Sequence, residues 1–334
     1  MDWSKGFSAQ YYASIVDARS WRDVDRIEIT EGSVEHSENG LRCSATVTCK
    51  DYAEDVEQWI RIYLIASQKD NSELVPLFTG LATSPEGQHD GLDRTNALEC
   101  YSVLKPAEDV LLPRGWYAAA GICGTDLIRD LLSVTPAPVE ADENAPVLQS
   151  AIVAEDHESR LSMCDKILTA IGWRIRISGD GTIRLCPAAR DVIATFNADD
   201  NDVIEPKISV SQDWFSCPNV FRAISGDMSG IARDDSEDSM LSTVSRGREV
   251  WTEESGCSLN EGETIADYAL RRLREAQEAA QSAKYSRRFL PDLVATDLVR
   301  MNYPAQGLIG VYKVASQSMV LGYGGRTTEE VKKV

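Results

Sequence analysis

The sequence has 334 residues, of which 43% are hydrophobic and 26% charged, and its formal net charge at pH 7 is −19. This composition is typical of a folded protein with two or three domains, and the negative charge argues against a DNA-binding surface held by phosphate contacts. No apolar run approaches the ~18 residues of a membrane helix, and the N-terminus has no signal-peptide pattern. We therefore expect a protein that is made in a cytoplasm and has no membrane partner.

The first hundred residues are predicted to be a run of strands. The strongest signal lies at residues 41–50, where apolar and polar residues alternate from Leu41 to Lys50 with the period of a half-buried strand. Several strands at even spacing with turn residues between them indicate a barrel or a sandwich. We assign residues 1–105 to a first β-barrel module. Further strands are expected at 26–30, 59–66, 74–82 and 97–104.

Residues 106–190 are predicted to form a small α+β domain. Thr125 is a candidate N-cap of a short helix, and a second helix over 158–171 ends at Gly172, a residue type favoured after a helix. Between these helices, residues 135–146 are rich in proline and acids and are expected to be a linker. Residues 173–185 alternate around a Gly-Asp-Gly turn at 179–181, which predicts a β-hairpin.

Residues 191–334 are predicted to form a second β-barrel module that contains the longest helix, 264–283. The apolar stripe of this helix is narrow and suits close packing on a sheet. Residues 226–262 are polar and acidic, and we expect a long excursion between strands there. The predicted fold class is thus β-rich α+β, with two β-barrel modules and an inserted small α+β domain. Strands of this module are expected at 204–210, 219–224, 285–290, 298–302 and 310–321.

The negative charge is concentrated in two stretches. Residues 199–267 contain 16 acidic and 5 basic residues, net −11, and residues 135–165 contain 7 and 1, net −6. In contrast, residues 268–334 have a net charge of +5. Acid-rich loops can simply be solvated and keep the protein soluble. Alternatively, an acidic face meets a basic partner or repels something that must not bind.

The eight cysteines are expected to be reduced. They include no CxxC pair, and Cys43, Cys49 and Cys100 occupy apolar positions of predicted strands, where cysteine is a small buried hydrophobic residue. The three histidines have no second ligand at a metal-binding spacing. We therefore predict no disulfide, no metal site and no cofactor.

The sequence contains no nucleotide-binding, zinc-protease or serine-hydrolase motif. A few weaker patterns favour turns or solvated acids over an anion site, a calcium loop, a glycosidase acid pair or a catalytic dyad. We assign no catalytic, cofactor-binding or metal-binding residue, and expect a protein that is not an enzyme. These weaker patterns are Gly121–Gly124, Asp199–Asp202, Asp234–Asp235, Glu253–Glu254 and the pair His157 and Cys164.

Several segments, in order along nearly the whole chain, resemble the baseplate hub proteins of contractile phage tails. The N-terminal residues 3–8 and 11–13 resemble hub proteins from prophages of Gram-positive bacteria, which are related to the late-control D and phage Mu type hub proteins. The strand end 76–80 is similar to the first barrel of that family, and the hairpin at 173–185 to its middle domain. The helix at 264–283 with the strand at 310–314 resembles its closing module.

This resemblance implies a homotrimer whose paired, tail-tube-like barrels form a pseudo-sixfold ring. The ring would join the tail tube protein to a trimeric spike protein, contact other baseplate proteins and line the channel of a phage tail or a headless, tailocin-like contractile injection system. The family has no catalytic residues to transfer.

Four alternative functions remain open at this point. They are a distal-tail adaptor, a tube-like tail protein, a tail-associated cell-wall hydrolase and a β-sandwich carbohydrate-binding module. In the hub interpretation, specific nucleic-acid binding is not expected, because carboxylates on the inner wall of a ring would repel DNA phosphate. The candidates for that wall are Asp227, Asp234, Asp235, Glu237 and Asp238.

Overall fold

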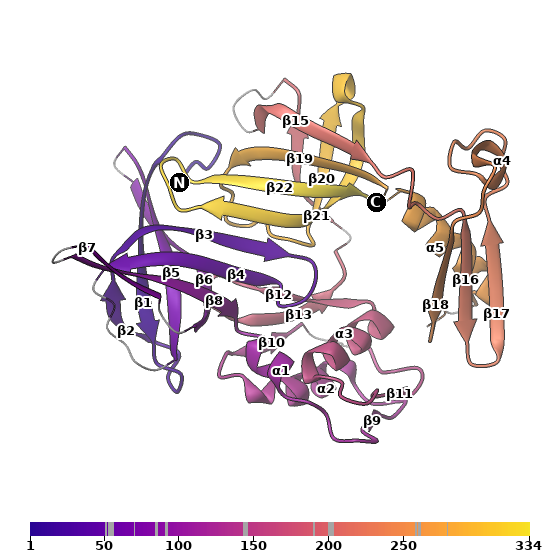
Figure 1. Ribbon diagram of the computed structural model, residues 1–334, viewed down its shortest axis with the longest axis horizontal. Coiled ribbons are helices and arrows are strands. Elements are labelled where there is room, and N and C mark those ends of the chain that lie inside the picture. The colour runs from indigo at the N-terminus through magenta and orange to yellow at the C-terminus, as the bar shows by residue number, and fades with distance from the viewer. Residues whose placement is uncertain are drawn as a thin grey trace.

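The chain is rich in strands and contains few helices (Figure 1), so the predicted β-rich α+β class is confirmed. None of the described helices is long and apolar enough to cross a membrane. The structure, a computed structural model, describes residues 1–50, 52, 57–69, 71–83, 86–90, 93–142, 146–189, 191–199, 204–257, 259, 262–278 and 280–334.

The first β-rich part contains the strands expected there, with the one predicted at 26–30 divided into β2 and β3, and it also contains β1 and β7, which were not expected. Strand β1 breaks the alternating pattern with the adjacent Tyr11 and Tyr12, and it pairs along its whole length with β5. Its polar and aromatic residues give a weak period-two signal, which explains why the pattern does not predict it. The elements are β1 (Ser8–Val16), β2 (Asp23–Ile27), β3 (Ile29–Ser37), β4 (Cys43–Lys50), β5 (Gln58–Gln68), β6 (Asn71–Ala82), β7 (Glu86–Asp90), β8 (Asp93–Ser102) and α1 (Lys105–Asp109).

The middle unit matches the predicted helices and hairpin closely. Gly172 ends α3 in the left-handed conformation, with φ of 67°, as expected for a residue that follows a helix. Two details differ. Cys123 rather than Thr125 is the N-cap of α2, and the expected linker 135–146 contains a strand, β10, that pairs with β13. The elements are β9 (Tyr117–Ala118), α2 (Gly124–Leu131), η1 (Leu132–Val134), β10 (Val139–Ala141), β11 (Ile152–Val153), α3 (Arg160–Ile171), β12 (Trp173–Ile177) and β13 (Ile183–Pro187).

The second β-rich part is built from strands on either side of a separate lobe. The strand β19 begins at Gln281, so the expected extension of the long helix to residue 283 is wrong. The elements of this part are β14 (Val192–Asn197), β15 (Ile204–Gln212), β19 (Gln281–Arg288), β20 (Leu298–Tyr303), η2 (Pro304–Gln306), β21 (Leu308–Val320) and β22 (Arg326–Lys333).

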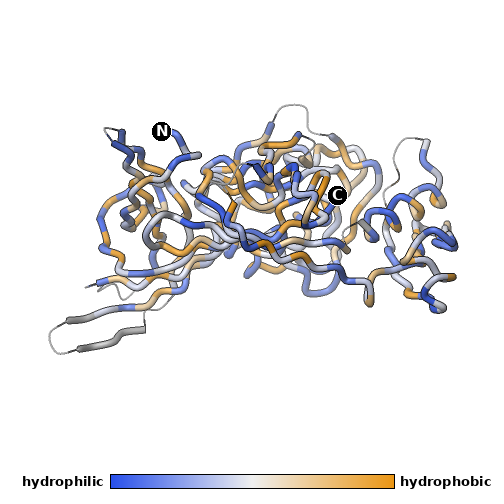
Figure 2. The backbone as a smooth tube through the Cα atoms, turned by 90° about the horizontal axis from the view of Figure 1, so that it is seen from above, coloured by the Kyte–Doolittle hydropathy of each residue, from blue (hydrophilic) through white to orange (hydrophobic). Residues whose placement is uncertain are grey.

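Residues 214–278, here called the lobe, have their own sheet and core. The long excursion between strands predicted for 226–262 is wrong, because these residues themselves supply two strands and a short helix. The helix α5 packs on the three-stranded sheet β17-β16-β18, so its predicted packing on a sheet is confirmed. Figures 1 and 2 show the lobe set apart at one end of the molecule. Its elements are β16 (Val220–Ser225), β17 (Met228–Arg233), α4 (Thr243–Arg246), β18 (Trp251–Ser255) and α5 (Ile265–Glu278).

One large sheet joins the two β-rich parts. Its main path runs β15-β19-β22-β21-β3-β4-β8-β6-β5-β1-β2, with β14, β20 and β7 attached beside it. The connection is the antiparallel pair β21–β3, in which Ser316 lies opposite Ser37 and Val320 opposite Ser33. The pairings among the described strands close neither part into a ring.

Buried apolar side chains form three clusters. One cluster spans the first β-rich part and the middle unit and includes Met319 and Leu321 from the second part. The other two lie within the second β-rich part and within the lobe. The first part and the middle unit therefore share a core, whereas the core of the lobe is its own. The domain boundaries at 105 and 190 remain a prediction.

Candidate assembly surfaces

The middle unit is fixed to the first β-rich part by a buried arginine. Arg61, 7% exposed, donates through Nε to Thr79 Oγ1 at 2.9 Å and through Nη1 to Asp23 Oδ1 at 2.8 Å. Its Nη2 reaches the carbonyl oxygen of Asp180 in the 179–181 turn at 3.0 Å, and Trp21 Nε1 donates to the same oxygen at 3.0 Å. These charge-assisted bonds hold the turn in one position against the sheet.

Two glycines allow this close contact. A Cβ atom on Gly179 would lie 1.8 Å from the carbonyl oxygen of Pro76, which no side chain can tolerate. Gly181 has φ of +84°, and a Cβ atom there would lie 2.8 Å from the Trp21 ring. The Gly-Asp-Gly turn predicted from sequence is thus also a docking element.

A buried carboxylate fixes the middle unit to the second β-rich part. Asp297 is completely buried and receives Arg174 Nη2 at 3.0 Å and Arg176 Nη2 at 3.2 Å, both from β12. The backbone N–H of Val294 donates to Asp297 Oδ2 at 3.1 Å, the oxygen that Arg176 also contacts. Since a buried charge is costly unless it is paired and hydrogen-bonded, this contact ties the position of β12 to that of the loop before β20.

A third ion pair lies beside the β21–β3 seam. Glu38, just after β3, pairs with Lys332 at 3.0 Å and also with Lys313. Burial by itself would raise the pKa of Glu38, but the hydrogen bonds from the two lysines lower it below its ordinary value. The body, meaning the two β-rich parts and the middle unit, is therefore held together by charged contacts at each of its junctions.

A cavity of 60 Å³ lies where the three parts of the body meet. Its lining includes His36 from β3, Pro76 from β6, Ile177 from β12, and Arg287 and Gln317 from the second β-rich part. Burial lowers the pKa of His36 to about 4, although a hydrogen bond with the backbone of Leu77 acts in the opposite direction. His36 is therefore neutral in the folded protein near pH 7.

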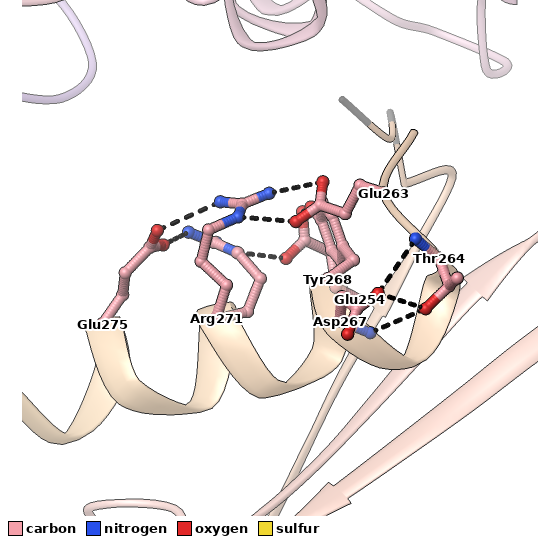
Figure 3. Close-up of polar contacts among 8 residues, drawn as sticks. Glu254, Glu263, Thr264, Asp267, Tyr268, Arg271 and Glu275 are labelled. Carbon is pink, nitrogen blue, oxygen red and sulfur yellow. Dashed lines mark hydrogen bonds and ion pairs between the residues drawn. The ribbon is translucent and has the colours of Figure 1, made fainter. Parts of the chain in front are cut away.

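The lobe uses charge in a different way, because four of its seven arginines form ion pairs with acids of the lobe itself, and two of these arginines are drawn in Figure 3. Arg271 Nε donates to Glu263 at 2.8 Å and its Nη1 to Glu275 at 3.0 Å, while Arg272 Nε donates to Glu254 at 2.9 Å. At the start of α5, Thr264 and Asp267 cap the helix reciprocally. Arg271 and Arg272 thus neutralise neighbouring acids, whereas other acids of the lobe have no cationic partner in the part of it that the structure describes.

The five acids proposed for a channel wall do not form one patch. Asp227 lies in the β16–β17 turn, whereas Asp234, Asp235, Glu237 and Asp238 follow the other end of β17. The six residues of β17 separate the two sites by roughly 15 to 20 Å. The fold therefore does not bring all five acids onto one wall. Only the four acids of residues 234–238 lie together.

The large sheet ends in open strands. Among the described strands, β2 pairs only with β1, and β15 pairs only with β19. Most residues of both end strands are exposed, including Val24 in β2 and Val210 in β15. Unpaired backbone groups on an edge strand can pair with another chain, so these edges are candidate assembly surfaces.

The acidic residues of the weaker sequence patterns do not come together in a catalytic or metal-binding site. Asp234 accepts hydrogen bonds from Ser239 Oγ and Gln277 Nε2, and Glu253 pairs with Arg222. Among the described residues, no group of three His, Cys, Asp or Glu side chains is arranged to hold a metal ion. Of residues 199–202, only Asp199 lies within the described part of the chain.

All eight cysteines lie in the described chain and are free thiols. Cys43, Cys49 and Cys100 are buried, as predicted for small hydrophobic residues of strands. Burial raises the pKa of Cys43 and of Cys49 to about 12. These thiols are therefore protonated and unreactive at neutral pH.

No protein-family model matches the sequence, and no curated protein matches it. Solved structures do match, over nearly the whole chain. A tail protein from Neisseria meningitidis MC58 matches with a TM-score of 0.70 and 13% identity, over 97% of this chain and 96% of that one. The 43 kDa tail protein of prophage MuSo2 from Shewanella oneidensis matches with a TM-score of 0.68 and 12% identity, over the same shares. The chain has the fold of phage tail proteins.

A third match comes from a bacterial secretion system. It is a component of the E. coli type VI secretion system, described as similar to the T4 bacteriophage tail proteins gp27 and gp5. It matches with a TM-score of 0.54 and 6% identity, over 92% of this chain and 74% of that one. The predicted resemblance to phage tail proteins is therefore confirmed at the level of the fold.

Proposed function

We propose that this chain is a structural subunit of the baseplate hub in a contractile phage tail or a tail-like particle. The observation that carries the proposal is the fold match with tail proteins along 97% of the chain, lobe and middle unit included. The match with the type VI component, whose description refers to two T4 tail proteins, favours the hub over other tail positions. At such low identity, the specific role rests on the physical features that follow.

The sheet topology favours assembly into a ring. Its end strands, β2 and β15, carry unpaired backbone groups, and pairing with neighbouring copies would satisfy them. The buried contacts of Arg61 and Asp297 keep the body in one shape, which a ring of fixed diameter requires. We propose a homotrimer in which residues 1–105 and 191–334 act as two barrel-like modules, giving six positions around a central channel.

In this role the ring joins the tail tube protein to a trimeric spike protein and contacts other baseplate proteins. The protein is made in the bacterial host cytoplasm and then incorporated into the particle. It acts by position rather than by catalysis and uses no cofactor. A distal-tail adaptor or tube-like protein is the alternative among tail components, and a cell-wall hydrolase is the alternative enzyme.

Native mass spectrometry together with electron microscopy of the particle tests the proposal. We expect a species of three times the 36.8 kDa chain mass, alone or with the spike, and a ring at the junction of tube and spike. A hexameric ring at that level would instead favour the adaptor, and an oligomer joined mainly through residues 106–190 would contradict the arrangement. Clearing of a cell-wall zymogram by the purified chain would contradict the purely structural role.

A further inference from the structure

A broad groove of 1240 Å³ opens between the two β-rich parts. Its walls come from five separate segments: the N-terminal residues 5–8, the β5–β6 turn, the start of β15, the end of β19 and the β21–β22 turn. Tyr323, 94% exposed, stands at its rim. The groove is thus a feature of the assembled body rather than of any local motif.

The groove is basic in a protein of net charge −19. Lys5, Lys69, Arg287, Arg288 and Arg326 line it, and Glu205 is the one carboxylate among the lining residues that the structure describes. Glu205 pairs with Arg326, and the Lys5 ammonium lies 2.8 Å from Asp2. Arg288 donates to the carbonyl oxygen of Ser4, and within the described chain neither Arg288 nor Lys69 has a carboxylate partner. These two cations are available to an acidic ligand.

The lobe carries a matching acidic segment. We call residues 234–238 the acidic tip; its acids are Asp234, Asp235, Glu237 and Asp238. Glu237 and Asp238 are exposed, and neither has a cationic partner among the described residues. Asp235 lies 3.5 Å from Arg233, which bonds more closely to Glu249 at 2.6 Å. Met240, 69% exposed, follows the tip and adds an apolar contact of the kind found at interface centres.

The groove and the lobe lie at opposite ends of one strand. Strand β19 starts at Gln281, next to the lobe, and ends at Arg288, in the groove. Eight strand residues span roughly 25 Å. Figure 1 shows the lobe beyond the start of β19, at the end of the strand that lies away from Arg288. Two different, complementary surfaces at separate places on one molecule produce head-to-tail contacts, which close into a ring when the rotation allows it.

We infer that the acidic tip of one copy binds in the basic groove of the next copy. This inference rests on the proposed ring and names the surfaces that close it. Carboxylates of the tip approach Lys69 and Arg288, and Met240 packs near Tyr323 at the groove rim. The acids then lie at contacts between copies instead of on the channel wall expected from the sequence. Because these charges are exposed, they determine the choice of partner and the association rate more than the final affinity.

Charge reversal tests the pairing. The double variants Lys69→Glu/Arg288→Glu in the groove and Glu237→Lys/Asp238→Lys at the tip should each weaken self-association at least about tenfold in low salt. A chain that carries all four changes should recover most of that association, because both surfaces are reversed together. Arg114→Glu, on a 91% exposed side chain of the middle unit, is the control and should have no effect. Mass photometry across a dilution series measures each case.

If the isolated chain is monomeric, site-directed cross-linking in the assembled particle tests the same contact. Cysteines at positions 69 and 237, joined by a short bifunctional reagent, should link neighbouring copies, whereas a 69–114 pair should not. If the hub forms a ring of three but neither the cross-link nor the charge-swap recovery is seen, the inference fails while the proposed function stands. If no ring of copies is present at the tube–spike junction, the proposed function itself fails.

Discussion

The body and the lobe use charged residues in opposite ways. In the body, Arg61 and Asp297 are buried at junctions between parts, where each makes several hydrogen bonds that fix one part against another. In the lobe, Arg271 and Arg272 of α5 form surface ion pairs with Glu263, just before the helix, and with Glu254 of β18, and the acidic tip is left exposed. Charged residues of the body thus fix the relative positions of its parts, whereas those of the acidic tip remain available to a binding partner.

The largest expected effect is the loss of a body junction. Asp297→Ala leaves Arg174 and Arg176 without their buried partner, and removing one member of a buried pair costs about 3–5 kcal/mol of unfolding free energy. Urea denaturation should show this loss. Arg114→Ala removes an exposed pair with Asp156 at 3.8 Å and should change stability by less than about 1 kcal/mol. If the two substitutions lowered the unfolding free energy equally, the buried pair would contribute no more to stability than the exposed one.

The second effect should be confined to the lobe. Leu273→Ala removes a buried side chain from the small core of the lobe and should destabilise that core by about 2–4 kcal/mol. Hydrogen exchange should then increase in β16–β18 and α5, while the strands of the large sheet keep their protection. Leu98→Ala, in the core of the body, is the matched variant and should weaken protection throughout the body. If Leu273→Ala loosens the body equally, the lobe is not an independent unit.

A smaller effect should appear with pH at the junction cavity of the body. The pKa of His36 is lowered to about 4 in the folded chain, from 6.5 when unfolded, so the unfolded chain binds the proton more readily between these values. Stability is therefore full above pH 6.5 and falls toward pH 4, by at most about 3 kcal/mol for this group. In His36→Leu, the slope of unfolding free energy between pH 6.5 and 5 should be shallower than in the wild type. An unchanged slope would show that His36 titrates normally.

The smallest effect concerns the thiols. We expect them to form no stabilising disulfide and therefore to contribute no covalent cross-link to the free energy of unfolding. In the native state, a thiol reagent at pH 8 should modify the partly exposed Cys123 and Cys186 first, and the six buried cysteines only after unfolding. Mass spectrometry of alkylated, non-reduced protein should count eight free thiols. Two or more native disulfides would contradict both the reduced compartment and the buried positions of Cys43 and Cys49.

Local patterns predict the elements whose partners are close in sequence. The hairpin at 173–185, the strand from Cys43 and the helix that ends at Gly172 each carry a clear period and a clear stop residue, and each is present. In the lobe, β18 is missed because it reaches its partner β16 by a parallel, non-local pairing, which leaves no turn signal between them. The neighbouring strand β17 is missed although it forms a local hairpin with β16, because its buried positions are the small residues Gly230 and Ala232 and its alternation is weak. The β21–β3 seam joins residues about 280 positions apart, and the basic groove draws on five segments. Neither leaves a local trace in the sequence.

The position of the lobe in the chain has a consequence for how this fold can diverge. The lobe is inserted between two neighbouring antiparallel strands, and Gln212 at the end of β15 lies directly opposite Gln281 at the start of β19. A short turn could join these two residues, so the whole lobe occupies the place of a hairpin loop, and insertions at such sites are well tolerated. The lobe can thus be lost, enlarged or exchanged as a cassette without altering a single strand pairing of the large sheet. Particles with different neighbours could in this way keep one body and vary only the cassette.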